Sequence, residues 1–155
     1  MQGLVVRTKR QALGDFGERL VLAITCPRCK RGKTLRRLPA NFSSVDVICT
    51  FCGFLAQVKS VEKSNVDELP KYLLGGSWGP QREHIEAGIY FSIFIVVVTP
   101  NRKSSAVYYL PADLQSRTMF VPRTPLSSKA KSPGWQGFVI RLDDPDSHNP
   151  VRLRI

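Results

Sequence analysis

The sequence predicts a mixed α/β domain built around a small sheet. A segment near its start has helical spacing, since Phe16, Leu20 and Ile24 fall on one stripe. Several short runs rich in Val, Ile and Phe follow, the strongest being IYFSIFIVVV at 89–98. Together these signals give the order helix, strand, strand, polar excursion, strand, strand, short helix, strand. Such an order is typical of a mixed sheet flanked by helices.

Each expected element has a local signal. Gly14 and Asp15 suit the start of the first helix, and Pro111 suits the first turn of the second. The strands are enriched in Val, Ile and Phe, and the turn sequence TPNRKSS separates two of them. The expected elements are a helix at 14–25, strands at 44–49 and 54–60 joined by a turn at 50–53, strands at 90–99 and 106–110, a short helix at 111–116 and a strand at 137–142.

Other stretches carry no clear element. The basic segment KRGKTLRRL is predicted as a loop, and residues 65–88 are polar and broken by prolines and glycines, so short helices are the most we expect there. The stretch VPRTPLSSKAKSPGWQG is predicted as a long basic loop, with Trp135 expected in the core rather than stacked on a base. A polar tail with two prolines follows the last strand.

Length and composition indicate one soluble domain, residues 1–155. The chain is long enough for one core, and its 43% hydrophobic and 23% charged residues are ordinary for a globular protein. The longest apolar run is about half of what a membrane-spanning helix needs. The first residues also lack the apolar core of a secretory signal. We therefore expect a cytoplasmic protein that does not act on membranes.

The charge of the chain is strongly basic. Its 23 Lys and Arg against 12 Asp and Glu leave a net charge of +11. Such a domain usually binds a polyanion, and nucleic acid is favoured because no basic amphipathic helix is evident; a basic surface without a partner is the alternative. Two clusters are expected to contact phosphates. They are Arg28, Lys30, Arg31, Lys33, Arg36 and Arg37, and, in the later loop, Arg123, Lys129 and Lys131.

The four cysteines predict a structural zinc site. Cys26, Cys29, Cys49 and Cys52 form two CxxC pairs with nineteen residues between them, which is the spacing of a four-cysteine zinc ribbon spanning 26–52. Four thiolates complete a tetrahedron and leave no position for substrate, so this zinc would be structural. The alternatives are four free buried cysteines or a redox pair, and neither CxxC opens a helix in the setting that a redox pair requires.

Three polar residues interrupt the predicted hairpin at 44–60. With the turn tip at 50–51, residues whose numbers sum to about 101–103 face each other, which places Asp46 near Gln57. Gln57 and Lys59 are two apart and share a face. One interpretation is a solvated strand face with an exposed ion pair. The other is a nuclease site, in which two oxygen ligands hold magnesium and the lysine orients or deprotonates the attacking water.

The second interpretation agrees with a family resemblance. Asp46 on one strand, followed by Gln57 and Lys59 as Q-x-K on the next, resembles the PD-(D/E)xK nuclease superfamily. The stretch GDFGERLV is similar to the first core helix of that superfamily, in which Glu18 would lean toward the metal. The combination of CPRC, D-x2-C-x2-C, Q-x-K and PLSSKAKSPGWQGFVIRL closely resembles the catalytic domain of methyl-directed restriction endonucleases of the DpnI type, over roughly 14–142.

This resemblance implies a restriction-endonuclease-like core with an inserted zinc ribbon, and cleavage of double-stranded DNA. Magnesium or manganese would be held by Asp46, the Gln57 side chain and the Val58 carbonyl, with Lys59 assisting. Sensitivity to adenine methylation and a dimer on DNA are further expectations. They rest on the resemblance alone, since the winged-helix reader domain of the methyl-directed enzymes has no counterpart in these 155 residues.

Gln57 is also a departure from the family pattern. The second ligand of the family is acidic, and a neutral amide should bind a cation more weakly. Glu18 or Glu62 would offset the missing charge. If neither does, the alternative is a catalytically inactive zinc-ribbon protein whose nucleic-acid binding is sensitive to salt and indifferent to magnesium. An interaction module of a larger complex is a third possibility, and it would need an exposed apolar patch.

Overall fold

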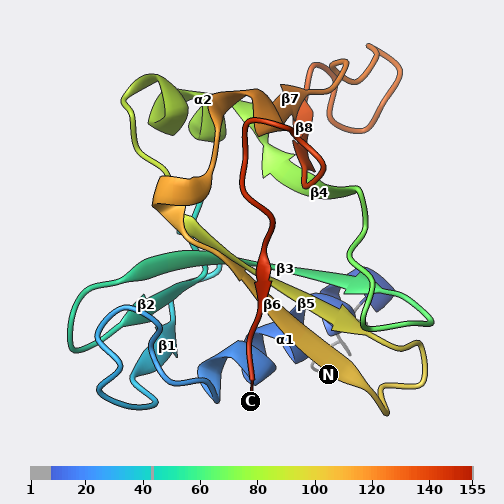
Figure 1. The fold of residues 1–155 in the computed structure, drawn as a ribbon. Helices are drawn as coiled ribbons and strands as arrows, with labels where there is room; N and C mark the ends of the chain where they lie inside the picture. Colours follow the sequence, from blue (N-terminus) through green and yellow to red (C-terminus); the bar gives the residue numbers. More distant parts are fainter. Residues whose placement is uncertain (1–7, 43, 155) are drawn as a thin grey trace, which may run out of the picture.

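The computed structural model describes residues 8–42 and 44–154 (Figure 1). The chain forms a mixed α/β fold, as the sequence predicts. Its elements in order are α1 (Lys9–Leu22), β1 (Leu35–Arg37), β2 (Val47–Cys49), β3 (Leu55–Glu62), β4 (Tyr72–Ser77), α2 (Trp78–Glu86), β5 (Ser92–Val98), β6 (Ser105–Leu110), 3-10 turns at Ala112–Leu114 and Arg117–Met119, β7 (Phe120–Pro122), β8 (Gly137–Arg141) and β9 (Val151–Arg152).

The strands form two sheets. The larger has six strands in the order β1-β2-β3-β5-β6-β9, in which β3 and β5 are parallel and the other neighbours antiparallel. The smaller is antiparallel, in the order β4-β8-β7. A parallel pair needs a long crossover. Here that crossover contains β4 and α2, so it supplies part of the second layer.

The core lies on both faces of β5, all of whose residues are buried. Side chains of a strand alternate between its faces. Phe94, Val96 and Val98 therefore pack in the cluster that includes the end of α1, while the odd-numbered residues between them pack against the second sheet and α2. Figure 1 shows the resulting layers, with α1 on one side of the large sheet and the small sheet with α2 on the other.

The helix α1 begins earlier than its apolar stripe suggests. The Thr8 hydroxyl accepts from the Gln11 N–H at 3.1 Å, and the Gln11 side chain accepts from the Thr8 N–H at 3.0 Å. This capping box starts the helix at Lys9 rather than at Gly14. Further along, Gly17 lies against β3 so closely that a Cβ there would be 1.8 Å from the Ser60 Oγ. The helix thus packs directly on the strand that carries Gln57 and Lys59.

The observed secondary structure differs in part from the elements predicted from the sequence. Every predicted strand occurs, although the strand expected at 44–49 covers only Val47–Cys49, and the last one belongs to the small sheet. The helix expected at 111–116 is a 3-10 turn. Four strands lie where loops or a tail were predicted: β1, β4, β7 and β9. Among the described residues, no helix is both long and apolar enough to cross a membrane.

Candidate active site and metal centre

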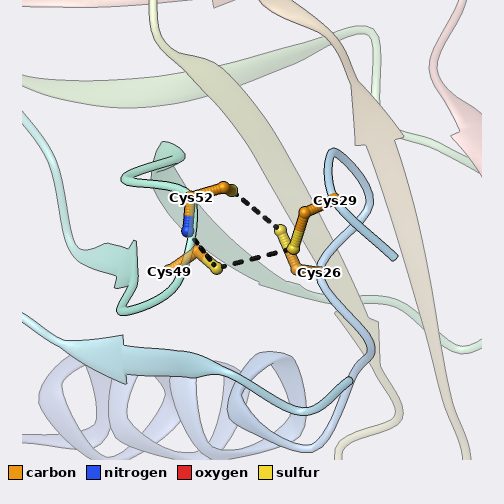
Figure 2. A group of neighbouring side chains, drawn as sticks. All are labelled: Cys26, Cys29, Cys49 and Cys52. Atoms are coloured by element: carbon orange, nitrogen blue, oxygen red, sulfur yellow. Dashed lines mark hydrogen bonds between the residues drawn. The ribbon is translucent and has the colours of Figure 1, made fainter. Parts of the chain in front are cut away.

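The four cysteines converge from two turns (Figure 2). Cys26 and Cys29 follow α1, Cys49 ends β2, and Cys52 lies in the turn between β2 and β3. Their sulfur atoms all lie within 4.8 Å of one another, and the Cys26–Cys52 and Cys29–Cys49 pairs are each 3.8 Å apart. In a tetrahedral zinc site with Zn–S bonds of about 2.3 Å, the sulfurs are about 3.8 Å apart. The cluster could therefore hold a zinc ion, as the spacing predicts.

Neighbouring groups favour the ionised form of one cysteine. The Thr34 hydroxyl lies 3.0 Å from the Cys49 sulfur, and the Cys52 N–H donates to the same sulfur at 3.4 Å. Burial by itself raises the pKa of Cys49, but these hydrogen bonds, with one from the Phe51 N–H, bring it down to about 6. Burial raises the pKa of Cys26 to about 12. A bound cation would stabilise both thiolates.

The hairpin of β2 and β3 has the predicted register. Val47 pairs with Ala56, so residues whose numbers sum to 103 face each other and Asp46 lies beside Gln57. The Asp46 Oδ2 accepts a hydrogen bond of 2.7 Å from the Val58 N–H, at the point where pairing with β2 ends. The N–H and C=O of one strand residue point to the same edge. The Val58 carbonyl therefore faces the edge where Asp46 lies.

The face of β3 that carries Gln57 and Lys59 is covered by protein. These residues pair in the parallel ladder with Ile93 and Ile95, whose side chains pack against the second sheet. Gln57 is only 5% exposed. The interpretation as a solvated strand face is therefore wrong: the second layer lies over these polar side chains.

Between the two layers lies a cavity of about 370 Å³, which we call the central cavity. Asp46, Gln57 and Lys59 all line it. Ser77 and Gln81, from the end of β4 and from α2, line the opposite wall. The three residues singled out in the hairpin are thus brought together on the wall of one open cavity.

Gln57 makes one buried hydrogen bond and leaves one atom without a partner. Its Nε2 donates to the Oε1 of Gln81 at 3.0 Å, and Gln81 is 3% exposed. The Gln57 Oε1 is buried and finds no hydrogen-bond partner among the described residues. Sequence reasoning missed Gln81, because it is separated from Gln57 by a crossover and has no local motif.

Burial also affects the lysine of the site. Burial lowers the pKa of Lys59 below its ordinary 10.5, and the negative charge of Asp46 opposes this shift. A lower pKa brings the neutral amine, which can accept a proton, within reach at a lower pH than for an ordinary lysine.

Neither Glu18 nor Glu62 lines the central cavity, but Glu18, on α1, interacts electrostatically with Asp46. Burial, followed by the charge of Asp46, raises the pKa of Glu18, although Arg37 opposes them. Glu18 is thus close enough to Asp46 for their charges to interact. Glu62 is exposed, lies on the other face of β3 from Lys59 and pairs with Arg102 at 2.9 Å.

All nine basic residues of the two predicted clusters are exposed. Arg37 is engaged within the chain, since its guanidinium contacts Asp15 at 2.7 Å and Glu18 at 3.2 Å. Sequence reasoning did not single out the basic residues Lys9 and Arg10. They line a second cavity of about 680 Å³ that shares Lys59 and Gly76 with the central cavity.

Trp135 lies on the rim of the second cavity. Its indole N–H donates to the Ser77 hydroxyl at 3.0 Å, and the residue is 40% exposed. The expectation that Trp135 is a core residue is therefore wrong. The glycines beside it allow a surface turn, in which Gly134 has a φ of +78°.

Comparison with known proteins identifies the family. A family model named DpnI and described as the Dam-replacing family matches residues 10–152. That range runs from α1 to β9 and contains both the cysteine cluster and the central cavity. A search of curated proteins finds no significant match. The mixed six-stranded sheet with its helices is consistent with a restriction-endonuclease-like fold. Because the family model matches nearly the whole chain, this protein belongs to the restriction-endonuclease-like DpnI, or Dam-replacing, family.

Proposed function

We propose that this protein is a metal-dependent endonuclease that hydrolyses phosphodiester bonds in double-stranded DNA. The observation that supports the proposal is that Asp46, Gln57 and Lys59 all line the central cavity, with Asp46 bonded to the Val58 N–H. Membership of a restriction-type family and the net charge of +11 support a DNA substrate.

The residues of the cavity suit magnesium or manganese. Both cations prefer oxygen ligands. The ligands would be the second carboxylate oxygen of Asp46 and the Oε1 of Gln57, two residues that line the cavity, and the Val58 carbonyl at the neighbouring strand edge; the Gln57 Oε1 is buried and lacks a partner among the described residues. Such a cation, when bound, stabilises the negative charge that develops on the phosphate.

In this proposal each side chain of the site has a separate role. Asp46 and Gln57 hold the cation, and Lys59 orients or deprotonates the attacking water. The lowered pKa of Lys59 suits it to this role. Glu18 adds negative charge next to Asp46, which compensates in part for the neutral amide of Gln57.

In this proposal the cysteine cluster holds a structural zinc. Its four thiolates fill a tetrahedral site and leave no position for substrate. The cluster ties the end of α1 to the tip of the β2–β3 hairpin, so zinc would fix the strand edge on which Asp46 and Val58 meet.

The exposed basic clusters would contact DNA phosphates on both sides of the cut. Sensitivity to adenine methylation, and a dimer that cuts both strands, belong to the same proposal and rest on the family resemblance.

The test uses plasmid DNA, adenine-methylated and unmethylated, incubated with the purified protein in magnesium, manganese or chelator. We expect cation-dependent cutting that Asp46→Ala and Lys59→Ala each reduce by about 10²–10⁴-fold. Lys63→Ala is the matched control, because Lys63 follows the same strand and pairs with Glu68 at 3.9 Å. All variants should retain about one zinc per chain.

Undiminished cutting by both variants would refute the proposed site. A difference between the two plasmids would establish methylation sensitivity. Salt-sensitive DNA binding without cutting under any condition would favour the second candidate, an inactive nucleic-acid-binding protein. The neutral side chain of Gln57, which replaces an acidic cation ligand, is the observation that favours this candidate.

A further inference from the structure

We propose that Gln81 is a positioning residue that turns the side-chain amide of Gln57 so that its oxygen, and not its nitrogen, is presented to the cation. The inference rests on the proposed function of the central cavity. It goes beyond that function because it assigns a role to a residue of α2, in the opposite layer.

The geometry of the two glutamines supports this role. The amide of Gln57 has a donor end and an acceptor end of similar size, so its hydrogen bonds decide which end faces the cavity. The Gln81 oxygen accepts from the Gln57 nitrogen at 3.0 Å, which directs the nitrogen toward α2. The Gln57 oxygen is left without a partner among the described residues, although it is buried.

A glutamine at this position needs such a partner, whereas an acidic residue would not. Both oxygens of a carboxylate can bind a cation, so a carboxylate works in either rotation. An amide in the wrong rotation presents its NH₂ group, which binds no cation. The change from an acidic ligand to Gln57 therefore creates a requirement that the Gln81 acceptor satisfies.

The helix that carries Gln81 is well anchored. Gln81 and Ile85 lie one turn apart and are the buried residues of α2. At the start of the helix, the Trp78 ring packs on Phe138 at 5.8 Å and the Trp78 N–H donates to the Gln136 carbonyl at 2.8 Å. A buried amide is costly unless it is hydrogen-bonded. Gln81 is thus held in a fixed place, facing Gln57.

The experiment is a double-mutant cycle measured as Mn²⁺ affinity, by electron paramagnetic resonance on the full zinc-loaded chain without DNA. Its members are the unchanged protein, Gln81→Leu, Gln57→Glu and the double variant. We expect Gln81→Leu to weaken Mn²⁺ binding about tenfold in the Gln57 background and less than about twofold in the Gln57→Glu background.

The matched control is Gln115→Leu. Gln115 donates to the Phe91 and Leu110 carbonyls and also leaves its Oε1 buried and unpartnered among the described residues, but it does not line the central cavity. We expect Gln115→Leu to lower the melting temperature and to leave Mn²⁺ affinity unchanged. Gln81→Glu keeps an acceptor for the Gln57 nitrogen and should keep Mn²⁺ binding, which provides a second test if Gln81→Leu does not fold.

The possible outcomes separate this inference from the proposed function. Equal losses of affinity in both backgrounds, no loss in Gln81→Leu, or a loss in Gln81→Glu would each overturn the positioning role. An unchanged protein that binds no Mn²⁺ and cuts no DNA would instead refute the nuclease proposal itself.

Discussion

The ammonium group of Lys59 lies on a face of β3 that the second sheet covers, and burial lowers its pKa below 10.5. The unfolded chain keeps the ordinary pKa. Between the two values it therefore binds more protons at this lysine than the folded chain does, and stability rises with pH across that interval. Below the folded pKa, the full cost of burying the charge remains.

Replacing Lys59 with Met should remove this cost. We expect Lys59→Met to be inactive but more stable at pH 7, with a melting temperature higher by about 2–4 °C for each kcal/mol recovered. The advantage should shrink as the pH rises toward 10.5, because the unchanged protein then loses its buried charge. Thermal unfolding of both proteins between pH 7 and 10.5 measures the difference. A variant that is less stable at pH 7 would contradict this account.

At the same scale, much of the candidate site could be predicted from the sequence. Strand alternation and the hairpin turn suffice to place Asp46 beside Gln57 and Lys59, because these are local relations within one hairpin. Gln81 could not be predicted, since its contact with Gln57 depends on how one layer folds over another. For the same reason, the sequence did not show that the face of β3 with Gln57 and Lys59 is covered by the second layer.

Among the secondary-structure elements, α1 and β3 depend on each other most closely. The absence of a side chain at Gly17 lets α1 approach Ser60, the neighbour of Lys59 on β3. Gly14 lies on the same helix, and a Cβ added there would meet no neighbouring element of the described chain within 4 Å. The two glycines therefore allow a matched comparison.

We expect opposite effects from alanine at these two positions. Gly17→Ala should destabilise the protein by about 1–3 kcal/mol through overpacking, and should reduce cutting because β3 is displaced. Gly14→Ala should stabilise it by about 0.5–1 kcal/mol, because alanine is the better helix former. Chemical denaturation of both variants measures these changes. A Gly17→Ala variant as stable as Gly14→Ala would show that the helix can move away from the strand at no cost.

The strands that were missed, and the weak signal of α2 within a stretch where only short helices were expected, have physical explanations. Pro80 and Gly79 normally interrupt helices, yet both lie in the first turn of α2, where a missing N–H costs nothing. Gly75 is typical of a turn, but here it lies in β4 and makes room for Phe138, which a Cβ would approach to 2.3 Å. The strands β1, β7 and β9 have three residues or fewer, too few to show alternation.

Over the whole molecule, the chain has a net charge of +11, and those of its basic residues that contact phosphates should set the dependence of DNA binding on salt. The logarithm of the binding constant should fall linearly with the logarithm of the salt concentration, and each phosphate contact removed should reduce the slope by about 0.9. Lys129→Ala and Lys131→Ala test this in the presence of Ca²⁺ in place of Mg²⁺. Lys103→Ala, exposed in the turn between β5 and β6, is the control and should leave the slope unchanged.

The position of β5 also has a consequence for how the chain acquires its structure. Its sequence SIFIVVV is covered on both faces in the folded protein. It pairs with the earlier strand β3, from which it is separated by a crossover that must itself form β4 and α2. Pairings between distant segments form slowly, and until then a bare apolar strand can pair with the same strand of another molecule. The yield of soluble protein should therefore depend on the concentration of newly made chains, so slow synthesis at low temperature favours the native product over aggregates.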